Sequence, residues 1–335
     1  MIKNICFFLL KILLFYSVVF IELRNFLFDL GLLRSKSFSK KIISIGNLSM
    51  GGAGKTPVEE YIIKLLSKKY KVALLCRGYK SKNKNFHELK VGDNPFIYGD
   101  EVVQIKNKYP GCLVFSCRDK IKGLNIITSN YKEVDVILLD DGYQKRSLNV
   151  DLNILLIDEK DYYDSVFPFG KLREPLYRSN RAHLIIYTKS SSNISLKNSS
   201  KQHIFHSNID YLNFYDFKGK LLKKNIYNFD CLAISGIAKP HYFNDFLKLN
   251  FKSFSCINFQ DHHNYKPSDI DKILNKYKSL RSNRKVIITT EKDYVKLSNS
   301  KFKTKLVGVP IYFLPICFKF DNEKKMSKII FDYVK

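Results

Sequence analysis

The sequence lacks the cysteine patterns that mark a disulfide framework or a zinc site. It contains seven cysteines, an odd number, and no two of them form a C-x-x-C pair. Small disulfide-stabilised domains carry even sets of cysteines, and structural zinc sites carry closely spaced pairs. We therefore expect thiols that are buried in the folded protein and kept in a reducing compartment.

The sequence also lacks internal repeats, a long disordered tail and a small-x-small cleavage motif after its apolar N-terminal run. A cleaved signal peptide is therefore disfavoured. With 335 residues, 45% of them hydrophobic, the chain is long enough for two globular domains that each bury a core.

Acidic residues are scarce: 31 Asp and Glu stand against 57 Lys and Arg, a formal net charge of +26. Such an excess suits a nucleic acid, an anionic membrane surface or a phosphorylated substrate. The lysines are scattered through every segment, so a general compositional bias explains the charge equally well. We expect no nucleic-acid partner, because a basic binding module would leave the acidic pair described below without a role. No obligate protein partner is evident.

The one long apolar run covers residues 5–21 and is interrupted by Lys11 and Ser17. A membrane span needs about 20 apolar residues, so this run is slightly short. We predict a helix over residues 1–30 that lies in the membrane interface, the alternative being a helix packed on the protein's own core. At 100° per residue its polar side holds Asn4, Lys11, Glu22 and Asp29, with Phe15 and Val18 intruding. The basic residues expected to face anionic lipid are Lys3, Arg24, Arg34, Lys36, Lys40 and Lys41.

Strand-like and helix-like segments alternate along the rest of the chain, which predicts an α/β fold with parallel sheets and ligands at the carboxyl ends of the strands. A Ser-, Asn- and Lys-rich segment at 190–200 separates two such series. The expected strands of the first series are 71–76, 112–116, 134–139, 152–157 and 183–187, and those of the second are 231–235, 251–257, 286–290 and 311–314.

A short β-branched run at 41–46 is followed by a glycine-rich segment. After that segment, apolar residues recur at helical spacing from Val58 to Leu66. Strand, glycine-rich loop and helix in this order predict a phosphate-binding loop. Its backbone N–H groups and the helix N-terminus would hold phosphate, Lys55 would reach the outer phosphates, and the Thr56 hydroxyl would ligate Mg²⁺. The predicted nucleotide-binding residues are Ser49, Met50, Gly51, Gly52, Ala53, Gly54, Lys55 and Thr56.

This loop departs from two standard patterns. The pattern G-x-x-x-x-G-K-[ST] has glycine where this chain has Ser49. The loop K-G-G-x-G-K-T of partition-type ATPases has lysine where this chain has Met50.

Three further segments carry residues suited to acid, base or metal chemistry. Asp140 and Asp141 end an apolar strand, as a Walker B element does, so one carboxylate can hold Mg²⁺ while the other orients a nucleophile or the loop. Asp100, in Gly99-Asp100-Glu101, is either a helix N-cap or a base for a substrate hydroxyl. The cluster Asp261-His262-His263 adds imidazoles, which could meet an acid from the other domain across a cleft and make catalysis depend on domain closure.

These residues together resemble the tetraacyldisaccharide 4'-kinase family, the lipid A 4'-kinases, over nearly the whole chain and in the same order. Ser49, which breaks the strict loop pattern, stands where family members have a small hydroxyl residue. The segments that carry the resemblance are Gly46–Pro57, Arg77-Gly78-Tyr79, Gly99-Asp100-Glu101, Asp140-Asp141-Gly142-Tyr143-Gln144, Leu172-Arg173-Glu174-Pro175, Phe259-Gln260-Asp261-His262-His263 and Thr290-Glu291-Lys292-Asp293.

The resemblance implies ATP- and Mg²⁺-dependent phosphorylation of the 4'-hydroxyl of a tetraacylated glucosamine disaccharide 1-phosphate, at the cytoplasmic face of the bacterial inner membrane. It implies that Asp100 is the catalytic base and His262 its partner, although His263 remains an alternative. Asp140 and Asp141 match the acidic pair near metal and nucleotide, with the direct metal ligand left open. Arg173 is a candidate for the acceptor's phosphate, because guanidinium pairs bidentately with phosphate, or else for a brace at the domain interface.

The resemblance also implies two α/β/α domains, the first with a P-loop NTPase-like parallel sheet, and an N-terminal membrane-associated helix. The boundaries expected from the sequence are 1–30 for this helix, 31–200 for the P-loop kinase domain, 201–230 for a linker or β-ribbon, and 231–335 for a smaller second α/β domain.

The main alternative is a membrane-associated ATPase or switch protein of the partition type. A GTP-dependent switch is disfavoured, because guanine recognition usually needs an Asn/Thr-Lys-x-Asp element. The nearest segment, Thr188-Lys189-Ser190-Ser191, ends in serine where that element has aspartate.

Overall fold

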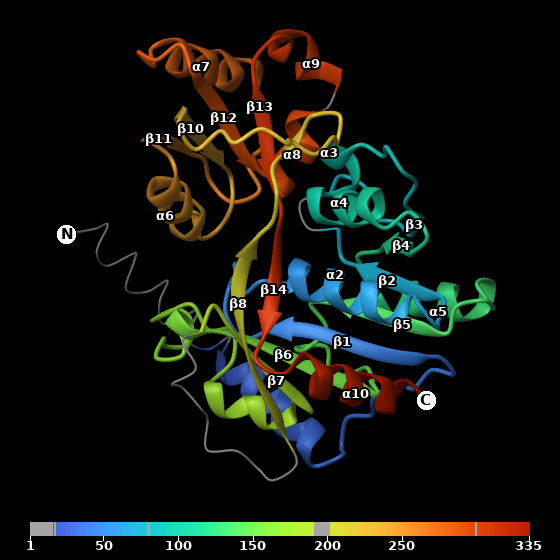
Figure 1. Cartoon of the computed structure of the whole chain (residues 1–335). Helices are drawn as coiled ribbons and strands as arrows, with labels where there is room; N and C mark the ends of the chain where they lie inside the picture. The colour runs from blue at the N-terminus through green and yellow to red at the C-terminus, as the bar shows by residue number, and fades with distance from the viewer. Residues whose placement is uncertain (1–15, 17, 79–80, 191–201, 299) are drawn as a thin grey trace, which may run out of the picture. The chain divides into compact units, whose positions relative to one another are not determined.

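The computed structural model describes residue 16 and residues 18–78, 81–190, 202–298 and 300–335. These residues form two compact units, each with a largely parallel sheet and packed helices (Figure 1). Unit 1 comprises residues 1–77, 117–209 and 318–335, and unit 2 comprises residues 78–116 and 210–317. The α/β class predicted from the alternating segments is confirmed.

Unit 1 is built around parallel strands whose neighbours run in the order β8, β7, β6, β1, β5, β2, with β14 beside β8. The central strands are buried along nearly their whole length, because helices cover both faces of a parallel sheet. The strands are β1 (Lys41–Asn47), β2 (Val72–Cys76), β5 (Val136–Asp140), β6 (Leu152–Asp158), β7 (Leu184–Thr188), β8 (His203–Tyr211) and β14 (Ile316–Phe320), and the helices are α2 (Lys55–Leu66), α5 (Lys120–Asn130), α10 (Glu323–Val334) and the 3-10 helices η1 (Glu159–Asp161) and η2 (Leu176–Arg181).

The register of β1 against β5 places functional segments at one edge of the sheet. Ile45 of β1 lies opposite Asp140, the last residue of β5. The loop that follows β1 and the acidic pair at the end of β5 therefore share the carboxyl edge, where ligands bind in parallel α/β sheets.

Unit 2 contains a second sheet in the order β11, β10, β12, β13, β9, in which only β9 is antiparallel to its neighbour. Alternate residues of β10 and β12 face opposite sides: Cys231 and Ile288 pack with α6, and Leu232 and Ile287 pack with α7 and α9. The sheet is thus the middle of three layers. Its elements are β9 (Tyr215–Asp216), β10 (Asp230–Ser235), β11 (Ser253–Asn258), β12 (Lys285–Thr290), β13 (Ile311–Leu314), α6 (Pro240–Asn250), α7 (Pro267–Lys278), α8 (Glu291–Leu297) and α9 (Ser300–Leu306), and the unit also holds β3 (His87–Glu88), β4 (Leu113–Ser116), α3 (Pro95–Tyr98) and α4 (Asp100–Lys108).

The units differ from the domain boundaries expected from the sequence. Residues 78–116 were expected in the first domain and belong to unit 2, whereas residues 318–335 were expected in the second and belong to unit 1. Residues 203–211, expected in a linker or β-ribbon, form β8, which extends the unit 1 sheet by pairing in parallel with β7. Both units are built from the same alternation of strands and helices, so the pattern does not reveal where the chain passes from one to the other.

The expected N-terminal helix is described only in part, because residues 1–15 and 17 lie outside the described residues. Residues 18–29 are helical. None of the helices in the described part of the chain is long and apolar enough to cross a membrane. Among the described cysteines, Cys76, Cys112, Cys117 and Cys231 are buried as expected, but Cys256 is exposed.

Candidate active site

The loop after β1 has the backbone conformation of an anion-binding nest. Gly51, Gly52 and Gly54 have φ angles of 79°, 68° and 85°, and α2 begins at Lys55. Left-handed residues of this kind turn successive N–H groups toward one point, and the helix N-terminus adds partial positive charge there. At Gly54 a Cβ would also come within 2.5 Å of the Phe318 ring. Only glycine satisfies both the angle and the space at this position.

The first half of the loop is fixed by the segment 171–173. The Met50 N–H donates to the Lys171 carbonyl (2.9 Å), and the Arg173 N–H donates to the Leu48 carbonyl. Ser49 is buried and forms an antiparallel bridge with Leu172. Asn47 adds a side-chain N–H bond to the Ser49 carbonyl at 2.6 Å. A small residue at position 49 therefore suits a buried segment whose backbone pairs with residues 171–173.

Lys55, Asp141 and Arg173 form a charged cluster beside the loop. Arg173 Nη1 donates to both Asp141 oxygens, at 2.9 and 3.1 Å, and Lys55 Nζ lies 3.6 Å from Asp141 Oδ1. Burial alone would raise the pKa of Asp141, but Lys55 and Arg173 hold it below its ordinary value. Asp141 also has a φ of 51°, a rare conformation for a residue other than glycine that is typical of functional sites.

Three residues that had no assigned role also hold this edge of the sheet. The Lys120 ammonium donates to the Asp140 and Asp141 carbonyls. Thr188 Oγ1 donates to the Ala53 carbonyl at 3.0 Å, and Lys189 Nζ bridges the Gly52 carbonyl (2.6 Å) and Asp158 Oδ2 (2.7 Å). The ends of β6 and β7 thus hold loop carbonyls in place, which leaves the opposite side of the loop, with its N–H groups, for phosphate.

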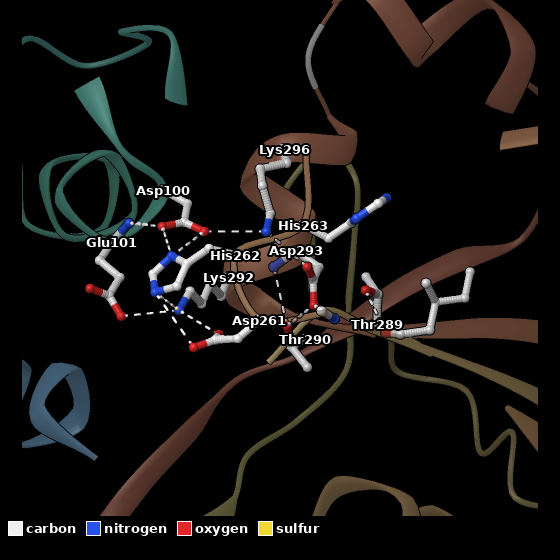
Figure 2. Close-up of polar contacts among 12 residues, drawn as sticks. Asp100, Glu101, Asp261, His262, His263, Thr289, Thr290, Lys292, Asp293 and Lys296 are labelled. Carbon is white, nitrogen blue, oxygen red and sulfur yellow. Dashed lines mark hydrogen bonds and ion pairs between the residues drawn. The ribbon is translucent and has the colours of Figure 1, made fainter. Parts of the chain in front are cut away.

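The second group of candidate residues lies in unit 2. His262 Nδ1 is 3.0 Å from Asp100 Oδ1 and 3.2 Å from Oδ2 (Figure 2). Asp100 is the first residue of α4 and is only 6% exposed. His262 lies in the turn after β11 with a φ of 55°, and its backbone N–H donates to the Gly236 carbonyl. His263 instead contacts Asp269 of α7, at 2.9 Å, so of the two neighbouring histidines only His262 pairs with Asp100.

Asp100 and His262 do not come from different units, as the sequence had suggested. The segment that carries Asp100 belongs to unit 2 together with His262. The inference that domain closure brings them together is therefore wrong, because the pair is formed within one folded unit.

Positive charge surrounds the Asp100 carboxylate. Lys296, itself 2% exposed, lies 3.2 Å from Asp100 Oδ2. Burial alone would raise the pKa of Asp100, but Lys292, the His262 hydrogen bond and Lys296 hold it well below its ordinary value. Its position at the start of α4 favours the ionised form further.

We expect this carboxylate to contribute to stability in a pH-dependent way. Its folded pKa lies below the value of about 3.9 of an unfolded aspartate, so its contribution is present above about pH 4 and lost as pH falls toward the folded pKa. In urea unfolding between pH 7 and 3, Asp100→Asn should lose less stability on acidification than the wild type. Parallel curves for the two proteins would contradict this expectation.

Comparisons with known proteins identify the family to which the chain belongs. The family model for Tetraacyldisaccharide-1-P 4'-kinase matches residues 6–335. The chain belongs to this family. Curated relatives include the tetraacyldisaccharide 4'-kinases of Flavobacterium johnsoniae, 39% identical with 97% of each chain covered, and of Phocaeicola vulgatus, 33% identical with 93% of this chain and 91% of the relative covered. A crystal structure of LpxK from Aquifex aeolicus in complex with ATP matches with a TM-score of 0.77 at 28% identity, covering 96% of this chain and 97% of the other.

Membership of the 4'-kinase family confirms the resemblance inferred from the sequence motifs. The chain is a kinase of lipid A biosynthesis that uses ATP to phosphorylate the 4'-hydroxyl of tetraacyldisaccharide 1-phosphate. The alternative of a partition-type ATPase or switch is set aside. Of the family motifs, Tyr79 lies outside the described residues.

Proposed function

We propose that the phosphate loop and Lys55 hold the triphosphate of ATP, and that Asp100, oriented by His262, receives the proton of the 4'-hydroxyl. The observation that carries this proposal is the buried Asp100 carboxylate, which is ion-paired with Lys296 and in contact with the His262 imidazole. The loop residues 49–56 supply N–H donors, and the ammonium of Lys55 balances phosphate charge. Positioning and charge stabilisation then account for most of the rate.

The donor set at the carboxyl edge of the unit 1 sheet fits Mg²⁺. This ion usually binds through one or two carboxylates and substrate phosphates, and keeps several waters. The Thr56 hydroxyl and one or both of the Asp140 and Asp141 carboxylates would provide the oxygen ligands, and Lys120 fixes the backbone that carries the two acids. When bound, the ion would neutralise charge on the β- and γ-phosphates.

Asp100 acts late in the transfer, because a carboxylate with a depressed pKa is a weak base. It first accepts a hydrogen bond from the 4'-hydroxyl and so directs the oxygen. As the new O–P bond forms and the bond from phosphorus to the leaving ADP oxygen breaks, the hydroxyl becomes acidic and its proton passes to Asp100. A loose phosphoryl-transfer transition state is compatible with this order.

Arg173 is proposed as a contact for the acceptor's 1-phosphate. Its guanidinium is about one-third exposed and pairs with Asp141. Asp141 therefore holds the guanidinium at the carboxyl edge of the sheet, where it can present a second N–H to a phosphate.

One assay tests the proposed reaction directly. Purified protein is incubated in detergent with γ-labelled ATP and the tetraacylated disaccharide 1-phosphate, and transfer to lipid is measured against release of free phosphate. We expect label in the lipid only when the acceptor is present. Acceptor-independent phosphate release without lipid labelling would contradict the proposal.

We also propose that the protein works at the cytoplasmic face of the inner membrane, held there by its N-terminal helix. Exposed apolar residues lie on one face of this helix and in the turn that follows it. They are Tyr16 (65% exposed), Val19 (48%), Phe20 (69%), Leu23 (54%), Phe26 (52%) and Leu30 (55%). A contiguous exposed apolar face of this kind marks an interaction surface.

The acidic side of the same helix is turned toward the rest of unit 1. Arg178 binds Glu22 (2.7 Å) and Asp29 (2.6 Å), and Arg146 binds Asp29 at 2.7 Å. This anchorage leaves the apolar face outward, which supports an occupant made of lipid. Three of the basic residues expected to face lipid, Arg24, Lys36 and Lys40, also donate hydrogen bonds within the protein. The proposed attachment is therefore mainly apolar.

Replacing Phe20 and Phe26 together with serine should weaken membrane attachment. Each phenylalanine transferred from water to lipid contributes about 1.5–3 kcal/mol. The partition coefficient onto phosphatidylethanolamine/phosphatidylglycerol vesicles, measured by co-sedimentation, should therefore fall at least about tenfold. Leu249→Ser, which removes an apolar side chain that is 85% exposed on α6, is the matched control. Equal losses in both variants, or none in either, would argue against a lipid-facing helix.

A further inference from the structure

Two lysines of α8 contact the catalytic pair. Lys296 lies on the carboxylate of Asp100, whereas Lys292 Nζ lies 3.1 Å from His262 Nε2, the ring nitrogen that does not face Asp100. Figure 2 shows the imidazole between Asp100 and Lys292. Every polar atom of the pair is thus met by a named partner within unit 2.

The Lys292 ammonium is itself held by carboxylates. Glu101 Oε1 lies at 3.1 Å and Asp261 Oδ1 at 3.5 Å. Burial opposes its charge, but Glu101, Asp100 and Asp261 raise the pKa of Lys292 above its ordinary value. The group facing His262 Nε2 is therefore a charged ammonium.

The chemistry of these contacts selects one form of the imidazole. An ammonium has three donors and no acceptor, so Nε2 beside it must accept, and the ring proton must then sit on Nδ1, where it donates to Asp100. In the opposite tautomer, the Nε2–H group would face the N–H groups of Lys292, and the lone pair of Nδ1 would face the Asp100 carboxylate. An imidazolium would set two positive charges 3.1 Å apart. Asp261 Oδ2, which would favour a proton on Nε2, lies at 3.8 Å, beyond hydrogen-bonding distance.

We propose that Lys292 is a positioning residue that holds His262 neutral, with its proton on Nδ1, and thereby fixes the orientation of the Asp100 carboxylate. Because Nε2 is occupied by Lys292, the imidazole orients the base and does not relay the proton. This inference rests on the proposed role of Asp100. In it, Lys292 acts on the reaction through His262 and does not itself bind the substrate.

The ring nitrogens of His262 provide a test that does not depend on activity. In the full chain labelled with ¹⁵N-histidine, protonated and unprotonated ring nitrogens resonate in separate ranges, and His262→Gln identifies the signal among the seven histidines. For the wild type near pH 7.5 we expect Nδ1 protonated and Nε2 unprotonated. A protonated Nε2, with or without a proton on Nδ1, would overturn the proposal.

Variants of Lys292 add the kinetic test. Lys292→Met should move the proton of His262 toward Nε2 and lower kcat on the order of tenfold to a hundredfold, with the KM for ATP nearly unchanged. Lys292→Arg, which also offers only donors, should keep the Nδ1 proton and most of the rate. Lys305→Met, which removes an exposed lysine paired with Asp271 in the same unit, is the control.

The outcomes are separable. If Lys292→Met changes neither the tautomer nor kcat, the proposal fails even though the kinase reaction stands. If wild-type protein transfers no label to lipid, the proposed function fails, while the ring-nitrogen signals still decide the tautomer. If Lys292→Met does not fold, the ring-nitrogen signals of the wild type and the tautomer and kcat of Lys292→Arg still test the proposal.

Discussion

Replacing Asp100 with asparagine is expected to lower kcat for 4'-phosphorylation by about 10²- to 10⁴-fold, the range that a positioned base contributes. Asparagine keeps the size of the side chain and its carbonyl can still accept from His262, but it cannot receive the hydroxyl proton. The KM for ATP should change little, because the phosphate loop lies in unit 1 and contains no part of this pair. Initial rates at varied ATP and acceptor concentrations measure both constants.

The matched control is Asp271→Asn, the same chemical change at an exposed aspartate of α7. It should leave kcat within about twofold of the wild type, because surface ion pairs contribute little. Circular dichroism at neutral pH checks that Asp100→Asn is folded. A folded Asp100→Asn protein that keeps more than a third of the wild-type kcat would remove Asp100 from its role as base.

Replacing Lys55 with methionine is expected to lower kcat/KM for ATP by at least about 10²-fold. The loss would follow from removing the positive charge that we propose faces phosphate in the ground state and in the transition state. Methionine fills a similar volume, and Asp141 keeps both of its hydrogen bonds from Arg173 Nη1, so the fold should remain. Steady-state kinetics with ATP varied at saturating acceptor measures the effect.

The control for Lys55 is Lys64→Met, which changes an exposed lysine on the same helix. It should retain wild-type kcat/KM, which separates loss of the phosphate contact from loss of general positive charge. If Lys55→Met bound ATP and turned over as the wild type does, the loop would have to hold its nucleotide through backbone groups alone.

The phosphate loop was readable from the sequence because all of its determinants are consecutive. A β-branched run, closely spaced glycines and an amphipathic helix specify local backbone geometry, and the three left-handed glycines agree with it. The acidic pair at the end of β5 was readable for the same reason. From the sequence, Thr188 and Lys189 were considered only as part of a guanine-binding element. Their position at the end of a predicted strand also indicated a place beside the phosphate loop.

The pair of Asp100 and His262 was not derivable from spacing, because 162 positions separate the two residues. Resemblance to a family named them, but it did not reveal that both belong to one unit. Lys292 was part of a recognised segment without a role. Its contact with His262 depends on how α8 packs beside α4 and the turn after β11, which is tertiary information that no local pattern carries.

The Phe318 ring packed against Gly54 bears on how the protein is made. Residues 318–335 complete the unit that holds the phosphate loop, and Tyr61 of α2 contacts both Phe320 and Ser327. A ribosome must therefore synthesise more than 250 residues after the loop before the loop's own unit can be finished. Nascent or prematurely terminated chains that stop before β14 would carry the whole nucleotide motif without the packing that shapes it. The shape of the loop therefore depends on residues that lie far from it in the sequence.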